Sequence, residues 1–211
     1  MGPPGVGKGT QARMLCRHLN VPHVSTGDIL REAVHGGTAL GRKVRPFLES
    51  GGLVPDDLMG ELVQDRLSRT DARGGFVLDG FPRTVAQVTT LDRVLGQLGV
   101  VLDRAFVLEA PEQEIVRRLS GRRVCPQCGS LYHLDSRPPR AAGICDGCGS
   151  ALVQRPDDEE HVVRRRLAVY GEQTLPVIQA YRERGLLWEV EGTGEADAVF
   201  ERLKKRGLGQ A

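Results

Sequence analysis

A glycine-rich segment at the beginning of the sequence constrains the fold more than any other feature. Residues 2–10 read Gly-Pro-Pro-Gly-Val-Gly-Lys-Gly-Thr and fit the pattern G-x-x-x-x-G-K. The glycines let backbone N–H groups converge on an anion without obstruction by Cβ atoms. A helix expected over residues 11–20 adds the positive end of its dipole, and Lys8 is placed to reach phosphate oxygens. This pattern predicts a phosphate-binding loop, in preference to a glycine-rich turn with one exposed lysine.

The loop departs from the general pattern in two ways. Gly9 stands where a Ser or Thr normally helps to hold Mg²⁺, and the hydroxyl comes one residue later, at Thr10. This order argues against the GTPase and motor branches of the phosphate-loop class. In addition, a phosphate loop normally follows a buried apolar strand, whereas only Met1 precedes this one. We expect either an upstream start codon, which we favour, or a sheet with a gap at its most buried position.

Strand-like runs alternate with longer helical patterns along the rest of the sequence. Extended or apolar runs at residues 22–25, 76–79, 104–108 and 187–190 are typical of buried parallel strands. Helical patterns cover residues 28–35, 39–49, 56–69, 85–98, 157–184 (with a bend near Pro176) and 196–205, and another begins at Pro111. The alternation predicts an α/β fold of the phosphate-loop NTPase type, with a parallel sheet as the middle of three layers.

Two stretches interrupt the alternation and divide the chain into three parts. Residues 25–54 are expected to form a helical insert between strands of the sheet. Residues 121–158 are rich in Pro, Gly and Cys, which predicts a separate small lobe. The core domain then comprises residues 1–24, 55–120 and 159–211.

Four of the five cysteines lie in the small lobe at metal-ligand spacing. Cys125 and Cys128 form one C-x₂-C pair, and Cys145 and Cys148 form a second after sixteen intervening residues. The two pairs predict a structural Zn²⁺ site whose four thiolate ligands leave no position for a substrate. The alternative is a pair of disulfides, which a reducing cytoplasm disfavours. Zinc also suits a lobe of under forty residues, because such a lobe is too small to build its own core.

Composition excludes several other classes of protein. Lys and Arg number 29 and Asp and Glu 27, so the net charge of +2 does not by itself favour a polyanionic partner. Aromatic residues, at 4%, offer few stacking platforms for single-stranded nucleic acid. No run approaches the ~18 apolar residues of a membrane-spanning helix. Met1 leads directly into the glycine-rich loop without the apolar segment of a signal peptide, so we expect a cytoplasmic protein without membrane or nucleic-acid partners.

Six segments, in order along the chain, resemble motifs of the adenylate kinases, specifically the long form whose lid carries zinc. They are the glycine-rich loop with Gln11, Ser-Thr-Gly-Asp-Ile-Leu-Arg at 25–31, Gly-Leu-Val-Pro-Asp at 52–56, Asp-Gly-Phe-Pro-Arg-Thr at 79–84, Gly-Arg-Arg at 121–123 and Arg-Pro-Asp-Asp at 155–158. The resemblance covers the chain up to the terminal helix and lacks only the first strand. It implies a monomeric enzyme that, with Mg²⁺, reversibly transfers the γ-phosphoryl group of ATP to AMP, giving two ADP.

The resemblance also implies roles for individual residues. Phosphoryl transfer requires neutralisation of developing charge rather than a general base, and arginines from several segments would supply it. The implied catalytic residues are Lys8, Arg83, Arg122, Arg155 and Arg166. ATP would bind at Gly5, Val6, Gly7, Lys8, Gly9, Thr10, Arg118, Arg122, Leu131, Tyr132 and Gly194. AMP would bind at Thr26, Arg31, Gly52, Leu53, Val54, Gly80, Phe81, Pro82, Arg83, Gln87, Arg155 and Arg166.

Three of the implied roles have explicit alternatives. Arg118 would pack against the donor base, and the alternative for any single arginine is a solvated surface charge. The amide of Gln87 would pair with the amino group and ring nitrogen of the acceptor adenine, and the alternative is a surface helix residue. Asp79 ends an expected buried strand, where an unpaired carboxylate is costly, and Mg²⁺ through bound water is its expected partner. Asp28 would share that role, with helix capping or loop fixing as the alternative.

Other functions are compatible with the same sequence. A relative with this fold would phosphorylate UMP, CMP or GMP if its acceptor pocket had a different shape. A zinc-ribbon nucleic-acid-binding protein with an ATPase domain would use arginines at 122–123 and 137–140 as a basic patch, although the near-neutral charge and scarce aromatics count against it. Without a first strand, the chain would also be at risk of folding poorly and being inactive.

Overall fold

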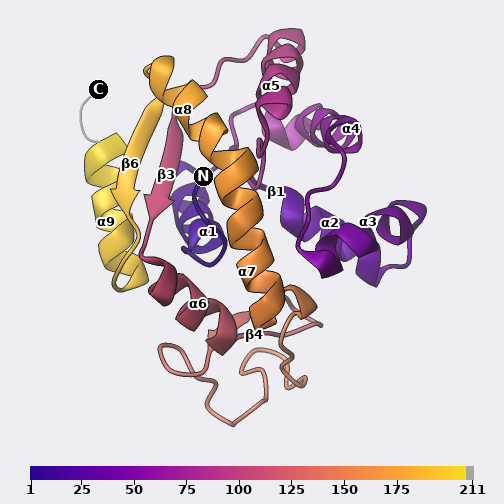
Figure 1. Cartoon of the computed structure of the whole chain (residues 1–211), viewed down its shortest axis with the longest axis vertical. Coiled ribbons are helices and arrows are strands. Elements are labelled where there is room, and N and C mark those ends of the chain that lie inside the picture. Colours follow the sequence, from indigo (N-terminus) through magenta and orange to yellow (C-terminus); the bar gives the residue numbers. More distant parts are fainter. Residues whose placement is uncertain (208–211) are drawn as a thin grey trace.

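The computed structural model describes residues 1–207 and places parallel strands between layers of helices, with a small lobe at one end (Figure 1). Two parallel pairs form the centre: β1 (His23–Ser25) with β2 (Val77–Asp79), and β3 (Ala105–Glu109) with β6 (Leu187–Glu191). The alternation of strands and helices expected from the sequence is confirmed. The last residues of the expected core domain, 208–211, lie outside the described residues.

The two parallel pairs are not joined in one hydrogen-bonded sheet within residues 1–207. Met1 lies alongside β3, where its carbonyl accepts a hydrogen bond from the Leu108 N–H at 3.0 Å and its amino group donates to the Phe106 carbonyl. A single residue cannot complete a ladder between the pairs, and all three residues of β2 are only half-buried. The single continuous sheet expected from the sequence is therefore divided at the position where one alternative placed a gap.

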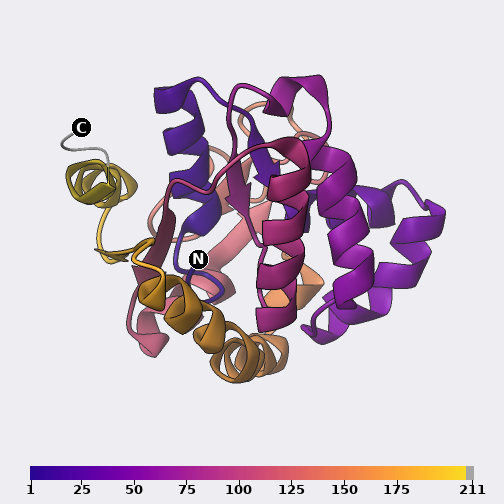
Figure 2. The same cartoon turned by 90° about the horizontal axis from the view of Figure 1, so that it is seen from above.

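Helices lie on both sides of the strands, and Figures 1 and 2 place α9 on the opposite side of the molecule from α2 and α3. None of the helices in the described part of the chain is long and apolar enough to cross a membrane. Hydroxyl side chains cap three of the helices, α2, α3 and α5, at their N-termini. The helices are α1 (Lys8–Leu19), α2 (Thr26–His35), α3 (Ala39–Ser50), α4 (Asp56–Leu67), α5 (Val85–Leu98), α6 (Glu112–Gly121), α7 (Glu160–Val169), α8 (Leu175–Glu183) and α9 (Ala196–Gly207).

The first helix begins at Lys8, three residues earlier than the sequence pattern predicts. Gly7 precedes it in the left-handed region of backbone conformation, at φ 106°, and turns the glycine-rich loop directly into the helix. Glycine adopts this conformation without the steric cost that a Cβ atom imposes. The loop and the first turn of α1 are therefore one continuous unit.

The long helical pattern near the C-terminus is interrupted, as expected, close to Pro176. A short 3₁₀ turn at Pro156–Asp158 precedes α7, and a π-helical turn at Tyr170–Thr174 separates α7 from α8. Pro176 lies in the first turn of α8 and has no N–H to donate to the preceding turn. A wider turn accommodates the missing hydrogen bond.

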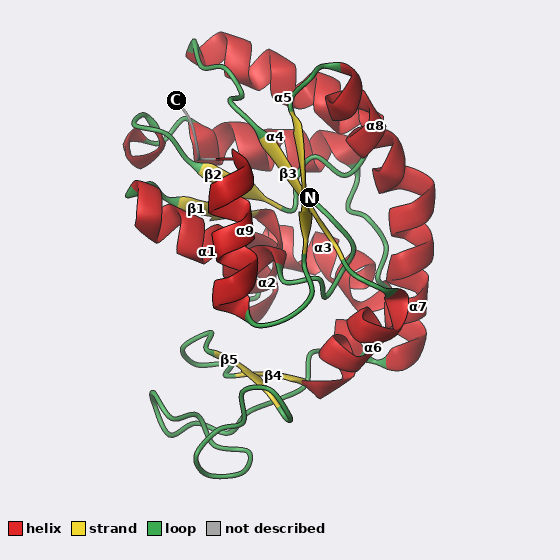
Figure 3. Cartoon of the chain, turned by 90° about the vertical axis from the view of Figure 1, so that its left-hand side faces the viewer, coloured by secondary structure: helices red, strands yellow, loops and turns green. Residues whose placement is uncertain are grey.

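The small lobe contains an antiparallel pair, β4 (Arg122–Val124) and β5 (Leu131–His133), and otherwise consists of turns (Figure 3). Figures 1 and 3 place it beyond the ends of α6 and α7, away from the parallel strands. Its apolar cluster is formed by Cys125, Tyr132 and Cys145. Such a small cluster gives the lobe little hydrophobic stabilisation.

Apolar clusters on the two sides of the strands hold the loop and helices in place. The largest packs Val24 of β1 against residues of α4 and α5, including Leu91. A second joins Val6 of the glycine-rich loop to Leu108 of β3 and Phe200 of α9. Because Val6 is only 1% exposed, the loop is anchored in the core at its centre.

Gly41 of α3 faces α2 too closely for a methyl group. A Cβ atom at Gly41 would lie 1.9 Å from the carbonyl oxygen of Ala33. We predict that Gly41→Ala lowers the free energy of unfolding by about 1–3 kcal/mol, because overpacking forces the two backbones apart. Gly96 is the matched control, since it is exposed within α5 and its Cβ would meet nothing within 4 Å.

Gly96→Ala should instead raise the free energy of unfolding by about 0.4–1 kcal/mol, because alanine restricts the unfolded chain. Urea titration of both variants measures these changes. Equal effects of the two substitutions would contradict the close packing of α2 and α3.

Candidate active site

The glycine-rich loop folds around the side chain of Lys8. The Nζ atom donates hydrogen bonds to the carbonyl oxygens of Gly2 at 2.8 Å and Pro3 at 2.7 Å. Gly2 and Gly5 have positive φ, and a Cβ atom at Gly2 would lie 2.2 Å from the Leu108 carbonyl oxygen. These two glycines are therefore required by close packing of the loop. In this structure the ammonium group of Lys8 is bound to the carbonyls of the loop itself.

The electrostatic environment of Lys8 is strongly positive. Burial lowers the pKa of Lys8 to about 7, the carboxylate of Asp79 opposes this shift, and Arg83, Arg166 and Arg122 add to it. Arginines from three different parts of the chain therefore act on the ammonium group of the loop lysine. Such a group of cations, held in a partly dry site, is suited to binding a polyanion.

Asp79 lies at the end of β2 and faces the first turn of α1. Its Oδ2 is 3.4 Å from where a Cβ atom of Gly9 would stand, and 3.5 Å from Nε2 of His23. Burial raises the pKa of Asp79, but His23 and Lys8 outweigh that effect and lower it to about 2. The carboxylate is therefore ionised beside the loop, next to Gly9, which stands where other phosphate loops carry a hydroxyl.

Three of the predicted catalytic arginines meet at the root of the small lobe. Arg122 forms a bidentate pair with Asp158, with Nε and Oδ2 2.7 Å apart. Nη1 of Arg166 lies 2.9 Å from Oδ2 of Asp157 and 3.4 Å from Oδ1 of Asp158. Burial, followed by the charges of Arg31 and Arg122, lowers the pKa of Arg155 to about 10. The two aspartates, which sequence reasoning did not assign to the site, partly neutralise this cluster.

A pocket between α2, α3, α5 and α7 contains most of the residues predicted to bind the acceptor. Its lining includes Leu30, Leu48, Gly51, Met59 and Asp157, which sequence reasoning missed. The apolar members continue the helical periodicity of α2, α3 and α4, so a sequence pattern alone does not distinguish them from core residues. The predicted residues that line it are Thr26, Arg31, Gly52, Leu53, Val54, Gly80, Arg83, Gln87 and Arg166.

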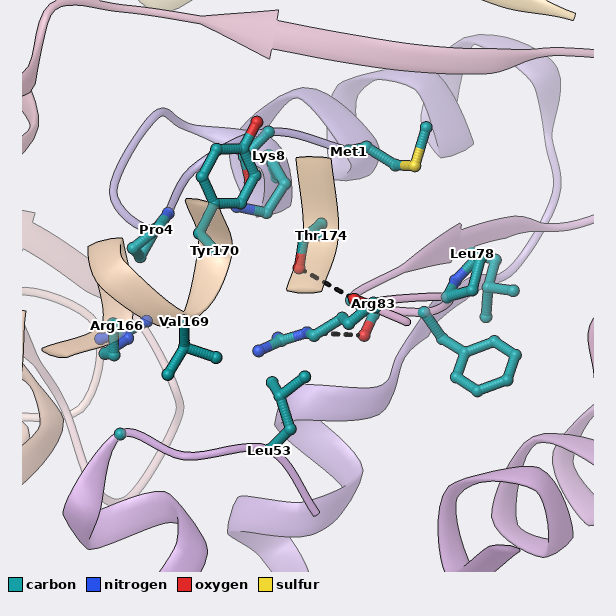
Figure 4. Close-up of a pocket in the computed structure, with 15 residues that line it drawn as sticks. Met1, Pro4, Lys8, Leu53, Leu78, Arg83, Arg166, Val169, Tyr170 and Thr174 are labelled. Atoms are coloured by element: carbon teal, nitrogen blue, oxygen red, sulfur yellow. Dashed lines mark hydrogen bonds between the residues drawn. The ribbon is translucent and has the colours of Figure 1, made fainter. Parts of the chain in front are cut away.

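A neighbouring pocket connects this one to the phosphate loop (Figure 4). Lys8, Arg83 and Arg166 line it from three sides, together with Phe81, Pro82 and the π-helical turn. The Nε of Arg83 donates to the Gly80 carbonyl at 2.8 Å, and burial lowers the pKa of the Arg83 guanidinium to about 10. Arg83 therefore lies at the junction of the two pockets, because it lines both of them.

Comparisons with known proteins agree with this arrangement. A family model described as adenylate kinase matches residues 1–186. The adenylate kinase of Methanocella arvoryzae is 50% identical over 203 residues, which make up 96% of this chain and 94% of that protein. The adenylate kinases of Caldicellulosiruptor bescii (49% identity, covering 99% and 97%) and Moorella thermoacetica (52%, covering 95% and 92%) are similar. This chain belongs to the adenylate kinase family. The predicted phosphate-loop NTPase fold and ATP:AMP phosphotransferase activity are thereby confirmed.

Gln87 of this adenylate kinase family member is buried, at 2% exposure. The alternative of a surface helix residue is therefore wrong. Its amide contacts Asp56 and the backbone N–H of Arg83, and it lines the pocket between α2, α3, α5 and α7. Thr26 is also buried and donates a hydrogen bond from its hydroxyl to the Asp79 carbonyl at 3.3 Å.

The residues predicted for the donor base are dispersed. The Nη1 of Arg118 donates to the carbonyls of Val6 at 3.2 Å and Gly192 at 2.9 Å, so this guanidinium ties the phosphate loop to the segment after β6. Tyr132, next to Leu131 on β5, turns its ring into the small lobe, where its hydroxyl lies 3.6 Å from Sγ of Cys145. Gly194 has positive φ and lies near Arg202. A stacking face for the donor base is thus not assembled from these side chains in the described residues.

Asp28 is engaged by arginines. Its carboxylate lies 2.6 Å from Arg31 and 3.8 Å from Arg13, and its backbone N–H donates to the side chain of Ser25. Burial alone would raise the pKa of Asp28, but the hydrogen bond and the charge of Arg31 outweigh burial, so the pKa is lowered overall. These contacts join α1 to α2 rather than fixing a loop, and they favour a structural role for Asp28 over a magnesium-binding one.

The four cysteines of the small lobe converge. All four Sγ atoms lie within 4.8 Å of one another, with 3.3 Å between Cys125 and Cys148 and 3.5 Å between Cys128 and Cys145. These distances exceed a disulfide bond of about 2.05 Å, so the disulfide alternative is wrong for this structure. A hydrogen bond from Tyr132 lowers the pKa of Cys145 to about 6, whereas burial raises the pKa of Cys125 to about 11.

The lowered pKa of Lys8 predicts proton uptake when a phosphate chain binds. At about pH 8 a lysine with a pKa of about 7 is roughly one-tenth protonated, and an anion restores the ordinary value of 10.5. Binding of Mg-ATP should therefore take up about 0.9 proton at that pH. Calorimetry in buffers of different ionisation enthalpy measures this number.

Lys8→Arg is the control, because a guanidinium remains protonated throughout this pH range. Proton uptake should disappear in this variant. Equal uptake by the Arg variant and the native chain would show that another group titrates.

Proposed function

We propose that the enzyme binds the ATP polyphosphate on the glycine-rich loop and AMP in the neighbouring pocket, so that the γ-phosphoryl group passes between them at Arg83. The observation that carries this assignment is the position of Arg83 at the junction of the two pockets, with Lys8 and Arg166 on either side. Both directions of transfer follow from the same arrangement, because two ADP molecules would occupy the same two sites.

The chemistry of this proposal is electrostatic. The attacking oxygen of AMP is already ionised, so no side chain has to act as a general base. Lys8, Arg83, Arg122, Arg155 and Arg166 would neutralise the charge on the transferring group. Part of their positive charge, that on Arg83 and Arg166, already lines one pocket, and Asp157 and Asp158 partly offset that of Arg166. Preorganised charge of this kind lowers the barrier without reorganisation of solvent.

Asp79 fits a water-mediated magnesium site. It is an ionised carboxylate beside the phosphate loop, next to Gly9, and carboxylate oxygens suit Mg²⁺. When bound, the ion would neutralise phosphate charge and orient the polyphosphate. Asp28 is already paired with Arg31, so we assign the ion to Asp79 alone.

We infer that two segments close over the substrates. Residues 25–54 would form the acceptor-binding insert and residues 121–158 the lid, moving on a core of residues 1–24, 55–120 and 159–211. The insert supplies Arg31, and the lid supplies Arg122 and Arg155. Closing would exclude water from the transferring phosphoryl group and so suppress hydrolysis.

The four lid cysteines fit a structural zinc site. Tetrahedral Zn²⁺ with Zn–S bonds of about 2.3 Å places sulfur atoms about 3.8 Å apart, close to the observed 3.3 and 3.5 Å and within the 4.8 Å limit for all four. The metal would be held by Cys125, Cys128, Cys145 and Cys148 and would stabilise the lid as a rigid unit. We further propose that the enzyme is a cytoplasmic monomer without nucleic-acid or membrane partners.

The acceptor is tested by measuring ADP formation from Mg-ATP with AMP, UMP, CMP or GMP. We expect a clear preference for AMP, because Gln87 can both donate to and accept from an adenine. Preference for another monophosphate would preserve the fold and the transfer mechanism, but would overturn the assignment of Thr26 and Gln87.

The zinc proposal predicts that chelation melts the lid before the core. Native chain should lose a low-temperature calorimetric transition after treatment with a chelator, and added Zn²⁺ should restore it. Metal analysis before and after treatment verifies removal. A single cooperative transition that the chelator leaves unchanged would contradict the proposal.

A further inference from the structure

The side-chain amide of Gln87 is held by two contacts that together permit one orientation. Its Nε2 donates to Oδ1 of Asp56 at 2.7 Å, and its Oε1 accepts from the backbone N–H of Arg83 at 2.7 Å. A carboxylate only accepts hydrogen bonds, and a backbone N–H only donates. A rotation of the amide by half a turn would set oxygen against oxygen on one side and N–H against N–H on the other.

Asp56 belongs to a small network that ties the start of α4 to the start of α5. Its Oδ2 accepts from the hydroxyl of Thr84 at 2.9 Å, and the same hydroxyl oxygen accepts from the backbone N–H of Gln87 at 3.2 Å. Thr84 is the residue that caps α5. Both the backbone and the side chain of Gln87 are therefore fixed at the edge of the acceptor pocket.

The network leaves one N–H and one oxygen lone pair of the Gln87 amide without a partner among the described residues. Adenine presents an amino donor at position 6 and a ring acceptor at N1. Hypoxanthine, the base of IMP, presents the reverse: an oxygen acceptor at position 6 and an N1–H donor. An amide of fixed orientation can form both hydrogen bonds with only one of these two bases. With the other base, donors face donors and acceptors face acceptors, and these buried groups stay unpaired.

We propose that Asp56 determines which purine monophosphate the acceptor pocket takes, by fixing the orientation of the Gln87 amide. Asp56 is a positioning residue, because it acts through Gln87 and does not itself touch the substrate. This inference rests on the proposed function, in which Gln87 pairs with the acceptor base. It adds a residue outside the pocket lining to the determinants of specificity.

The substitution Asp56→Asn tests the inference. The side chain of asparagine has the size of aspartate, but its amide can also donate a hydrogen bond to Oε1 of Gln87. The contact at position 56 then allows either orientation of the Gln87 amide, and one of the two constraints is lost. We expect the ratio of the IMP to the AMP dissociation constant to fall about tenfold, with the Arg83 N–H retaining the remaining preference. The turnover number at saturating AMP should change little.

The ratio of dissociation constants separates positioning from a merely structural role. Loss of folded protein or a general loosening of α4 would weaken both nucleotides alike and leave the ratio unchanged. An unchanged ratio in Asp56→Asn would therefore overturn the inference. Asp57→Asn is the matched control, since Asp57 is the exposed neighbour and carries the same charge, and its ratio should equal that of the native chain.

Gln87→Ala distinguishes failure of the inference from failure of the proposed function. If Gln87→Ala leaves the AMP dissociation constant unchanged, then Gln87 does not read the base, and both proposals about it fail. If it weakens AMP while Asp56→Asn leaves the ratio unchanged, only the role of Asp56 is refuted. If both proposals hold, Asp56→Asn should have no further effect on the ratio of dissociation constants when it is added to Gln87→Ala.

Discussion

The burial of several cations close to one another is the constraint on which the arrangement of this enzyme depends. Lys8, Arg83, Arg155 and Arg166 each have a pKa lowered first by burial, with neighbouring cations adding to the effect. In a low-dielectric site repulsion between these cations is costly unless negative charge is supplied. Phosphate groups supply it, so ligand binding and stabilisation of the folded site are the same event.

The carboxylates of the site divide the cations into two groups. Asp79 lies beside the phosphate loop, and Asp157 with Asp158 lies where the small lobe meets α7. Asp158 contacts both Arg122 of the lobe and Arg166 of α7. The lobe is therefore connected to the site through charge as well as through the chain. Pairs of this kind exchange partners readily when a phosphate competes for the same guanidinium.

Local motifs made the loop, the cysteine cluster and much of the acceptor pocket predictable from sequence. Each depends on short spacing, such as the glycines around Lys8 or the C-x₂-C pairs. The divided sheet was foreseen only as an alternative, because it depends on the residues that lie next to Met1. The partners of Gln87 and Arg122 were not foreseen, because Asp56 and Asp158 lie 31 and 36 residues away and reach them only through the tertiary fold.

The π-helical turn at Tyr170–Thr174 changes the direction in which side chains point along one long helical segment. Arg166 and Val177 are eleven residues apart, about three full turns of an uninterrupted α-helix, so their side chains would project in nearly the same direction. One faces a charged pocket, and the other is fully buried among apolar side chains. A wide turn absorbs roughly one extra residue and rotates the helix after it by about 100°. A single length of helix can in this way serve two chemically opposite surroundings.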